Sequence, residues 1–402
     1  MPKPSCRKIG SEVYWLSVPD TETKRFENLW PIPDGINYNA YLIGGGEEYL
    51  LVDSSKGTMH VEEFVDLIKT IVEPNKIKHV AMLHTEPDHS GLISEISRLL
   101  PNATLYSTAR ACTCMKGMFN VEPRVVKDGE LVRVGNRRLR VIDLPWIHWP
   151  DSMFLYLEDE EILFTSDAFG AFGALQKPVF DDEVDFPSYL KQMKDYFSTV
   201  VVAHRAMVLR DVDKVKRLGL NVKMIAPAHG VVYRSKIQEF TETQASWCAL
   251  KKKSKVTIAY GSMYGFTEKL AGFATDVLRE NVEEVALHDV TAETVNPILS
   301  DILDSAGVLF LTPTYESNIF PPVSNLLELL RIKRLGEGKL AAAVVTKLWG
   351  GGAPAHIASR LKEASYTLFE PVREFVNYPS EEELKDIREF LLKFWEKALQ
   401  GI

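Results

Sequence analysis

Four side chains of types that bind metal ions lie within six positions of one another near residue 85. The stretch 79–91 begins as a short apolar run and continues into the cluster His84, Glu86, Asp88 and His89. An apolar run bounded by turn residues predicts a buried strand, which Pro87 would end. The stretch 92–100 then has the apolar spacing of a helix. We therefore expect the cluster on a loop between a strand and a helix, where binding and catalytic residues are often found.

Three further candidate ligands each follow a separate apolar run. His148 follows the run 141–147, Asp167 follows 162–166, and His229 follows 224–228. A lone side chain of this kind is more often a hydrogen-bonded structural residue than a ligand. The three candidates nevertheless repeat one arrangement, in which a strand is followed by a ligand and then by a turn. Together with the cluster at 84–89, they indicate one shared site.

The seven candidates supply four imidazoles and three carboxylates, and none is a cysteine. This is more than one tetrahedral zinc ion needs, because zinc sites use three or four protein ligands. The set suits two metal ions, with one carboxylate able to bridge them. Mixed imidazole and carboxylate ligation with open positions is typical of iron. The sequence therefore predicts a two-metal site, with iron as the expected metal.

The elements that must position these residues make the first part of the chain rich in strands. Apolar residues recur at helical spacing over 61–72, which predicts a helix there. Strands are expected at 13–18, 39–43, 49–53, 104–107, 124–126, 130–134 and 139–144. This pattern predicts a strand-rich domain with few helices.

The pattern changes after the charged segment 251–255. Strands at 256–260, 285–290, 307–312 and 340–346 then alternate with helical stretches such as 268–278 and 323–330, and a last amphipathic helix covers 381–399. Regular alternation of this kind predicts a doubly wound parallel sheet. We therefore predict an α/β protein with two domains, residues 1–253 and 254–402.

The loop after the first strand of the second domain has the residues of an anion site. Ser262, Gly265 and Thr267 lie between that strand and a helix, where backbone N–H groups, hydroxyls and the helix dipole can face an anion. It is not a P-loop, because no lysine or arginine lies within 261–267. A phosphate held without lysine resembles the flavodoxin site for the FMN phosphate. The alternative is an ordinary strand-to-helix turn.

Two later loops also follow strand ends, as the switch-point rule for such sheets requires. Tyr315 is expected beside the flavin ring and Trp349 on its other side, although surface packing is the alternative for both. The predicted FMN-binding residues are Ser262, Met263, Tyr264, Gly265, Thr267, Pro313, Thr314, Tyr315, Trp349, Gly350 and Gly351.

Composition narrows the function classes. The chain has 402 residues, of which 46% are hydrophobic and 25% charged, as in ordinary globular proteins. A net charge of −8 gives no indication of a nucleic-acid-binding surface. The four cysteines, two of them at Cys112 and Cys114, are too few and scattered for a disulfide framework, and we expect that pair to pack. Without a long apolar segment or a signal peptide, we expect a cytoplasmic protein that does not enter a membrane.

Four motifs, in this order along the chain, resemble the flavodiiron proteins. They are His-x-Glu-x-Asp-His at 84–89, the segment 144–152 around His148, Ser166-Asp167-Ala168-Phe169-Gly170 and Pro227-Ala228-His229-Gly230. The resemblance covers the whole chain and implies a metallo-β-lactamase-like αββα sandwich followed by a flavodoxin-like domain. In the hydrolase branch of that fold, the position of Glu86 is usually histidine.

The resemblance also implies which residues hold each metal. One iron would be bound by His84, Glu86 and His148, the other by Asp88, His89 and His229, and Asp167 would bridge them. In some members a water replaces the ligand at the position of His89. Many members have a histidine near the substrate pocket, in a segment that here is 25–28 and contains none. The proton role of that histidine is therefore not carried over.

The implied activity is reduction of O2 to water, of NO to N2O, or of both. FMN would pass electrons to the irons from an external donor, because the chain has no rubredoxin-like pair of Cys-x-x-Cys motifs. Rubredoxin, reduced coenzyme F420 and another flavoprotein all remain open as donors. The resemblance further implies a head-to-tail homodimer, or a dimer of dimers, in which the FMN of one chain faces the irons of the other.

Two other functions stay open at this point. A metal-dependent hydrolase with an accessory binding domain would use a metal-bound hydroxide, but Glu86 and the flavin-like loops speak against it. An electron carrier with a vestigial metal domain is the other alternative, and the complete ligand set speaks against that.

Overall fold

A computed structural model describes residues 3–57, 61–175 and 177–401. The chain divides into two compact units, Met1–Phe197 with His204–Ala245, and Ser198–Ala203 with Ser246–Ile402. The predicted domain limits, 1–253 and 254–402, place the division a few residues later and stay a prediction. Within the described ranges, no helix is both long and apolar enough to cross a membrane.

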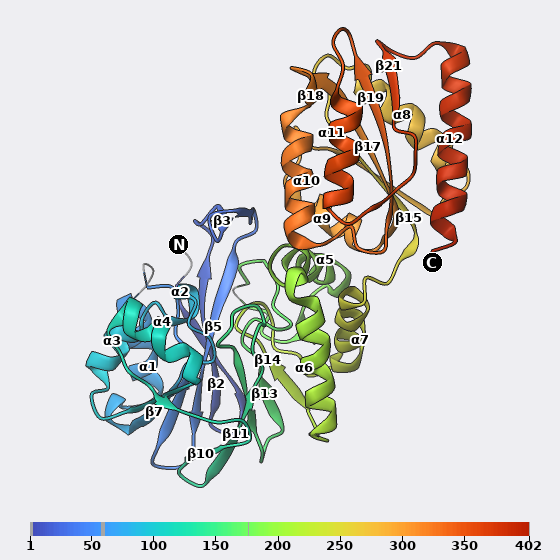
Figure 1. Cartoon of the computed structure of the whole chain (residues 1–402). Helices are drawn as coiled ribbons and strands as arrows, with labels where there is room; N and C mark the ends of the chain where they lie inside the picture. Colours follow the sequence, from blue (N-terminus) through green and yellow to red (C-terminus); the bar gives the residue numbers. More distant parts are fainter. Residues whose placement is uncertain (1–2, 58–60, 176, 402) are drawn as a thin grey trace. The chain divides into compact units, whose positions relative to one another are not determined.

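Two β-sheets form the centre of the first unit (Figure 1). The larger sheet has the strand order β1 (Ser5–Gly10), β2 (Val13–Asp20), β5 (Ile36–Gly44), β6 (Tyr49–Val52), β7 (Ile77–Ala81), β8 (Thr104–Ser107) and β9 (Arg124–Val125). The smaller sheet has the order β10 (Leu131–Val134), β11 (Arg137–Asp143), β12 (Met153–Leu157), β13 (Ile162–Phe164) and β14 (Met224–Ala226). Side chains from both sheets, such as Trp15 and Leu155, share one buried core. This is the predicted β-lactamase-like sandwich.

The first unit also contains helices and a short hairpin. The hairpin is formed by β3 (Arg25–Phe26) and β4 (Trp30–Pro31). The helices of this part are α1 (Val61–Ile71), α2 (Pro87–Ser90), α3 (Ile93–Leu99), α4 (Ala109–Phe119), α5 (Phe186–Tyr196), α6 (Arg205–Arg217) and α7 (Ile237–Cys248). The sequence pattern predicts α1 but not α4, α5 or α6. Helix α4 buries only Ala111 and Met115, so its apolar periodicity is weak, and it carries Cys112 and Cys114 as half-buried free thiols.

The second unit contains a parallel sheet with helices on both faces (Figure 1). Its strands are ordered β16 (Glu284–Asp289), β15 (Lys253–Tyr260), β17 (Ser305–Tyr315), β19 (Leu340–Lys347) and β20 (Thr367–Leu368), with β21 (Arg373–Val376) also beside β19 and β18 (Asn318–Ile319) beside β17. The helices are α8 (Phe266–Arg279), α9 (Val295–Leu303), α10 (Pro321–Lys333), α11 (Ala353–Glu363) and α12 (Glu381–Leu399). Helices α8 and α12 pack together over one core. The order is that of flavodoxin-like sheets, as predicted.

Backbone hydrogen bonds join the loops that carry the candidate ligands. Met153 N donates to Leu83 O over 3.0 Å, which links the start of β12 to the residue before His84. Ala228 N donates to Ser166 O over 2.7 Å, which joins the segments of His229 and Asp167. These bonds bring ligands that are distant in sequence to one end of the sandwich.

An ion cluster around the buried His288 should make the stability of the second unit depend on pH. His288 Nδ1 lies 2.7 Å from Glu293 Oε2, and its Nε2 lies 2.8 Å from Asp301 Oδ2. Burial lowers the pKa of His288, but the two carboxylates outweigh burial and raise the pKa above its usual value. Charged His288 therefore adds stability below the unfolded-state pKa of about 6.5, and this stability is lost as pH rises through the higher folded-state pKa.

We expect His288→Gln to destabilise the second unit more near pH 6 than at about pH 9, because only the charged imidazole strengthens these ion pairs. Hydrogen exchange of β16 and α9 amides in the full chain, corrected for intrinsic exchange rates, measures this difference. Equal destabilisation at both pH values would contradict the assignment of charge to His288.

Candidate metal centre and flavin pocket

The cluster at 84–89 begins in the segment after β7 and continues into the short helix α2. Glu86 precedes this helix and Pro87 is its first residue, where a missing N–H group removes no helical hydrogen bond. Asp88 and His89 lie within the helix, so the cluster is partly helical where the sequence pattern predicts a loop. All four candidate ligands of the cluster are buried.

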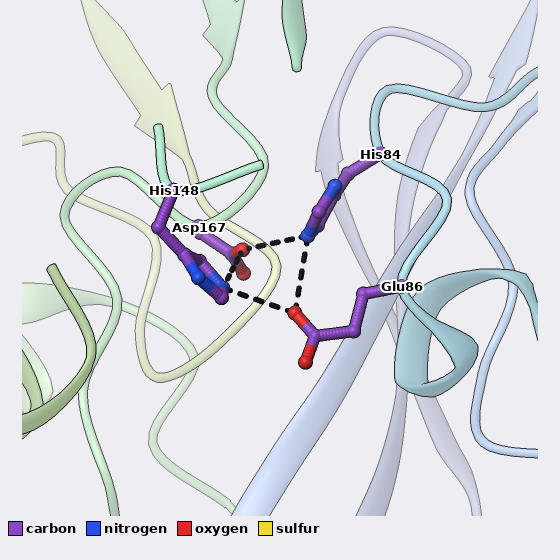
Figure 2. A group of neighbouring side chains, drawn as sticks. All are labelled: His84, Glu86, His148 and Asp167. Atoms are coloured by element: carbon purple, nitrogen blue, oxygen red, sulfur yellow. Dashed lines mark hydrogen bonds and ion pairs between the residues drawn. The ribbon is translucent and has the colours of Figure 1, made fainter. Parts of the chain in front are cut away.

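The first group of candidate ligands consists of His84, Glu86, His148 and Asp167 (Figure 2). His148 Nε2 lies 3.0 Å from Glu86 Oε2 and 3.2 Å from Asp167 Oδ2. His84 Nε2 lies 3.1 Å and 3.2 Å from the same two oxygens. Two imidazole nitrogens and two carboxylate oxygens therefore converge closely enough to hold one metal ion.

The second group consists of Asp88, His89 and His229. His89 Nε2 and His229 Nε2 lie 3.0 Å and 3.2 Å from Asp167 Oδ1, and each lies 3.4 Å from an oxygen of Asp88. Asp167 thus turns Oδ2 toward the first group and Oδ1 toward the second. The fold brings all seven predicted residues together in two groups, and one carboxylate lies between the groups.

Several of these buried atoms lack a hydrogen-bond partner among the described residues. They are Nε2 of His89, His148 and His229, and both carboxylate oxygens of Asp88 and Asp167. Buried polar atoms without partners are costly, and native proteins have few of them. Two cations would satisfy these atoms together. The residues therefore fit a dinuclear metal site.

Without metal, the imidazoles and carboxylates stabilise one another's charges. Burial lowers the pKa of His148, but Asp167 and Glu86 outweigh burial and raise it to about 9. In the same way, Asp167 and Asp88 raise the pKa of His229 to about 10 against the effect of burial. Burial raises the pKa of Glu86, but the two neighbouring histidines outweigh it and lower that pKa to about 2. The Glu86 carboxylate is therefore ionised, which is the form that binds metals.

Two of the candidate histidine ligands have polar neighbours behind the ring. His229 Nδ1 lies 2.7 Å from the carbonyl oxygen of Asn37, to which it can donate, so that Nε2 keeps its lone pair for a metal. His84 Nδ1 lies 3.5 Å from Oδ1 of the fully buried Asp151. Asp151 Oδ2 also accepts from the backbone N–H of Thr85 over 2.9 Å. Asp151 therefore fixes the backbone next to His84 and places a negative charge beside the His84 ring.

Replacement of Asp151 by asparagine should weaken metal binding at the first group. Asparagine can keep the acceptor for Thr85 but removes the charge beside His84, and loss of such an outer partner costs about 10- to 100-fold in metal affinity. Competition with a chelator measures the affinity for each metal. The metal at the second group should be retained. If the Asp151→Asn protein bound each of the two metals as tightly as the native protein does, this positioning role would be contradicted.

Aromatic rings line the second group. Phe26 comes from the segment 25–28 that lacks a histidine, and its buried ring lies 5.8 Å from the ring of His229. Tyr38 and Tyr196 contact the same imidazole at 5.8 Å and 5.6 Å between ring centroids. The sequence analysis missed both tyrosines, since buried aromatic residues in strands and helices are typical core residues. Phe26 thus makes one wall of the site apolar.

A pocket on the second unit collects most of the predicted flavin residues. Its predicted lining residues are Ser262, Met263, Tyr264, Thr267, Pro313, Thr314, Tyr315 and Trp349. The predicted Gly265, Gly350 and Gly351 are not among the lining residues. Residues that the analysis did not predict also line it, namely Phe266, Glu316, Ser317, Thr346, Lys347, Leu348 and Asn377. Asn377 follows β21, a strand that has no motif in the sequence.

The residues present fit a bound flavin phosphate and ring. Gly265 has a φ of 87°, which favours glycine, and its N–H donates to Ser262 Oγ over 3.1 Å at the start of α8. The buried Thr314 Oγ1 has no partner among the described residues. Tyr264 and Trp349 are 77% and 69% exposed, so their rings are free to cover a ligand. The loop can hold an anion, and the aromatic rim a planar ring.

Two protein families match the chain, one in each of its two units. The family described as ODP family beta lactamase matches residues 36–230, and the flavodoxin family matches residues 258–390. The chain is 33% identical to the nitric oxide reductase of Moorella thermoacetica over 364 residues, which is 90% of each chain. The chain belongs to the flavodiiron proteins. It is therefore a flavodiiron oxidoreductase, and its flavodoxin domain implies FMN.

Solved flavodiiron structures share the architecture. The flavodiiron protein of Giardia intestinalis has a TM-score of 0.94 at 26% identity, over 99% of this chain and 97% of that one. The rubredoxin oxygen:oxidoreductase of Desulfovibrio gigas also has a TM-score of 0.94, over 99% of both chains, and its 24% identity shows the fold alone. Family membership leaves the hydrolase alternative without support.

Proposed function

We propose that this flavodiiron protein reduces NO to N2O, O2 to water, or both, with electrons relayed through FMN from an external donor. The observation that carries the proposal is the pair of buried ligand groups that share Asp167, on a chain that also has a flavodoxin pocket. The relative named nitric oxide reductase supports NO as a substrate. FMN would pass electrons one at a time from the donor to the irons, and the irons would supply them to the substrate. Zinc could not replace iron in this role, because it has no accessible redox change.

His84, Glu86 and His148 would hold one iron, and Asp88, His89 and His229 the other, with Asp167 between them. The interatomic distances of 3.0 to 3.4 Å within each group support this division. His89 is supported as a ligand because its Nε2 lies beside Asp167 Oδ1. The protein residues would keep Glu86 ionised and limit water through the apolar wall at Phe26.

The flavin would be held by the eight predicted residues that line the pocket. Ser262, Thr267 and backbone N–H groups at the start of α8 would hold the phosphate. Tyr315 and Trp349 would lie against the ring. The three predicted glycines would act through the backbone, by shaping the two loops.

The donor, assembly and location complete the proposal. Rubredoxin, reduced F420 or another external donor would supply electrons to FMN. A head-to-tail homodimer, or a dimer of dimers, would bring the FMN of one chain to the irons of another. We place the protein in the cytoplasm, without nucleic-acid or membrane partners, and keep 1–253 and 254–402 as the proposed domains.

The test starts with metal and flavin content per chain after purification without oxygen. We expect two irons and one FMN, followed by consumption of NO or O2 when reduced rubredoxin or reduced F420 is supplied. Zinc without flavin would overturn the proposal. Two irons with FMN, but no consumption of either gas with reduced rubredoxin, reduced F420 or a reduced flavoprotein, would overturn the assigned reaction.

A further inference from the structure

A cavity of about 200 Å³ lies in the first unit, outside both predicted sites. Its buried walls are apolar and include Phe154 of β12, Leu163 of β13, Ile225 of β14 and Val208 of α6. None of the predicted metal or flavin residues is among its lining residues. An apolar cavity of about 150 Å³ is large enough to hold benzene. This cavity therefore has room for one aromatic ring and a few further atoms.

Two buried polar side chains interrupt the apolar wall. They are Asp211 of α6 and Gln244 of α7, which are 2% and 3% exposed. Asp211 Oδ1 accepts from Arg210 Nε over 2.7 Å. In contrast, Asp211 Oδ2 and Gln244 Oε1 have no hydrogen-bond partner in the part of the chain that the structure describes. Burial of such atoms without a donor is costly, so the cavity offers two acceptors that a ligand could satisfy.

The two acceptors define the head group of a ligand for this cavity. They need hydrogens, which O2 and NO do not carry, so storage of either gas does not account for them. A hydroxyl group supplies one hydrogen, whereas an ammonium group supplies three. Burial raises the pKa of Asp211, and Arg210 and Lys214 only partly offset this effect, so a cation beside Oδ2 would stabilise the carboxylate. The other charged lining residue, Lys216, is exposed. The buried end of the cavity therefore favours a cationic head group.

We propose that this cavity is a binding site for a small organic amine with an apolar body. The apolar body, one aromatic ring on a short chain, would lie against Phe154, Leu163 and Val208. The ammonium group would donate to Asp211 Oδ2 and Gln244 Oε1. The amine is bound without reaction, and the site goes beyond the proposed function because its residues belong to neither predicted site.

The cavity also adjoins the loop that carries Asp167, the residue between the two ligand groups. Ala168 and Phe169, which follow Asp167, both line the cavity. Ser166 and Phe169 have φ angles of 49° and 67°, in the left-handed region that residues other than glycine rarely occupy. Such a conformation persists only where surrounding contacts hold it. An amine packed against Phe169 would add contacts of this kind, and we therefore expect it to strengthen metal binding.

The first experiment locates the bound amine. The probe 2-phenylethylamine is titrated into the full chain with FMN and diamagnetic zinc in place of iron, with carbon-13 in the methyl groups of isoleucine, leucine and valine. We expect the largest NMR shifts at Leu163, Val208 and Ile225. Ethylbenzene, which lacks the ammonium group, should bind at least about tenfold more weakly. Shifts centred elsewhere, or tighter binding of 3-phenylpropanoate than of the amine, would overturn the proposal.

Two substitutions test the acceptors one at a time. Asp211→Asn and Gln244→Met should each weaken binding of 2-phenylethylamine by about tenfold or more, with the affinity for ethylbenzene unchanged. Asparagine can keep the oxygen that accepts from Arg210 Nε, so α6 should keep its structure. Asp213→Asn is the matched control, because Asp213 lies on the same helix, is exposed and does not line the cavity. Native affinity in either cavity variant, or equal weakening in Asp213→Asn, would overturn the proposal.

The second experiment measures the affinity for iron by competition with a chelator, with and without saturating 2-phenylethylamine. In the native protein, the amine should raise that affinity by about fivefold or more. Leu220→Trp is the control, because Leu220 lines the cavity and is half-buried, so that a larger side chain there would block the cavity. In this variant the amine should have no effect. No change in the native protein would overturn the coupling to Asp167, and an equal change in Leu220→Trp would show that the amine acts elsewhere and overturn it too.

The first experiment is independent of the proposed function, whereas the second rests on the proposed iron site. If the native protein reduces neither gas, the proposed function fails, while the methyl shifts and the two cavity variants still decide whether the amine binds. If the native protein holds iron and reduces a gas, but 2-phenylethylamine does not shift the methyl groups of the cavity, this inference alone fails.

Discussion

Replacement of Asp167 by alanine is expected to remove most of both metals and abolish gas reduction. Asp167 is fully buried. Its Oδ2 lies 3.2 Å from Nε2 of His84 in the first group, and its Oδ1 lies 3.0 Å and 3.2 Å from Nε2 of His89 and His229 in the second. Alanine would leave both groups short of one anionic ligand. Loss of a residue that only orients a ligand lowers metal affinity by up to about 100-fold. Loss of Asp167, a ligand itself, should lower metal affinity by more than that. Iron content by mass spectrometry and NO or O2 consumption measure the two effects.

Asp181→Ala is a suitable control for that variant. Asp181 is a buried carboxylate of the same unit that accepts from the backbone N–H groups of Arg234, Ser235 and Lys236. Its loss should lower the free energy of unfolding yet leave two irons per chain. Two irons and full activity in Asp167→Ala would refute the bridging role, and metal loss in both variants would attribute the effect to unfolding.

Replacement of Ser262 by aspartate should release FMN and leave the metal centre loaded. Ser262 Oγ accepts from the N–H of Gly265, and an aspartate oxygen can take over that bond, so the loop should keep its shape. The added charge would face the flavin phosphate, and two like charges about 4 Å apart repel by about 4 kcal/mol at an effective dielectric constant near 20. We expect the Kd for FMN to rise at least about 100-fold. Titration of the apoprotein by flavin fluorescence measures it.

Ser380→Asp places the same charge on the same unit without approaching the pocket. Ser380 is the N-cap of α12, a position where aspartate is also favourable, and it does not line the flavin pocket. Its Kd for FMN should equal that of the native protein. Tight FMN binding by Ser262→Asp would show that the phosphate lies elsewhere than at the start of α8.

The sequence determined the chemical composition of the metal site. His84 and Glu86 follow one strand, and His148, Asp167 and His229 each follow another, so their positions after apolar runs could be recognised without coordinates. The alternation of strands and helices after residue 256 determined the parallel sheet for the same reason. Local periodicity depends only on neighbouring residues, and these elements bury regular apolar faces.

The tertiary structure alone decided how the groups face one another. Which oxygen of Asp167 faces which histidines depends on how segments after β7, β11, β13 and β14 meet at the end of the sandwich. Tyr38 and Tyr196, which line the second ligand group, carry no motif, and a buried tyrosine is usually a core residue. Their contacts with His229 arise because β5, the end of α5 and the segment after β14 meet at this site. Contacts of this kind depend on strand pairing between distant parts of the chain, which local spacing does not specify.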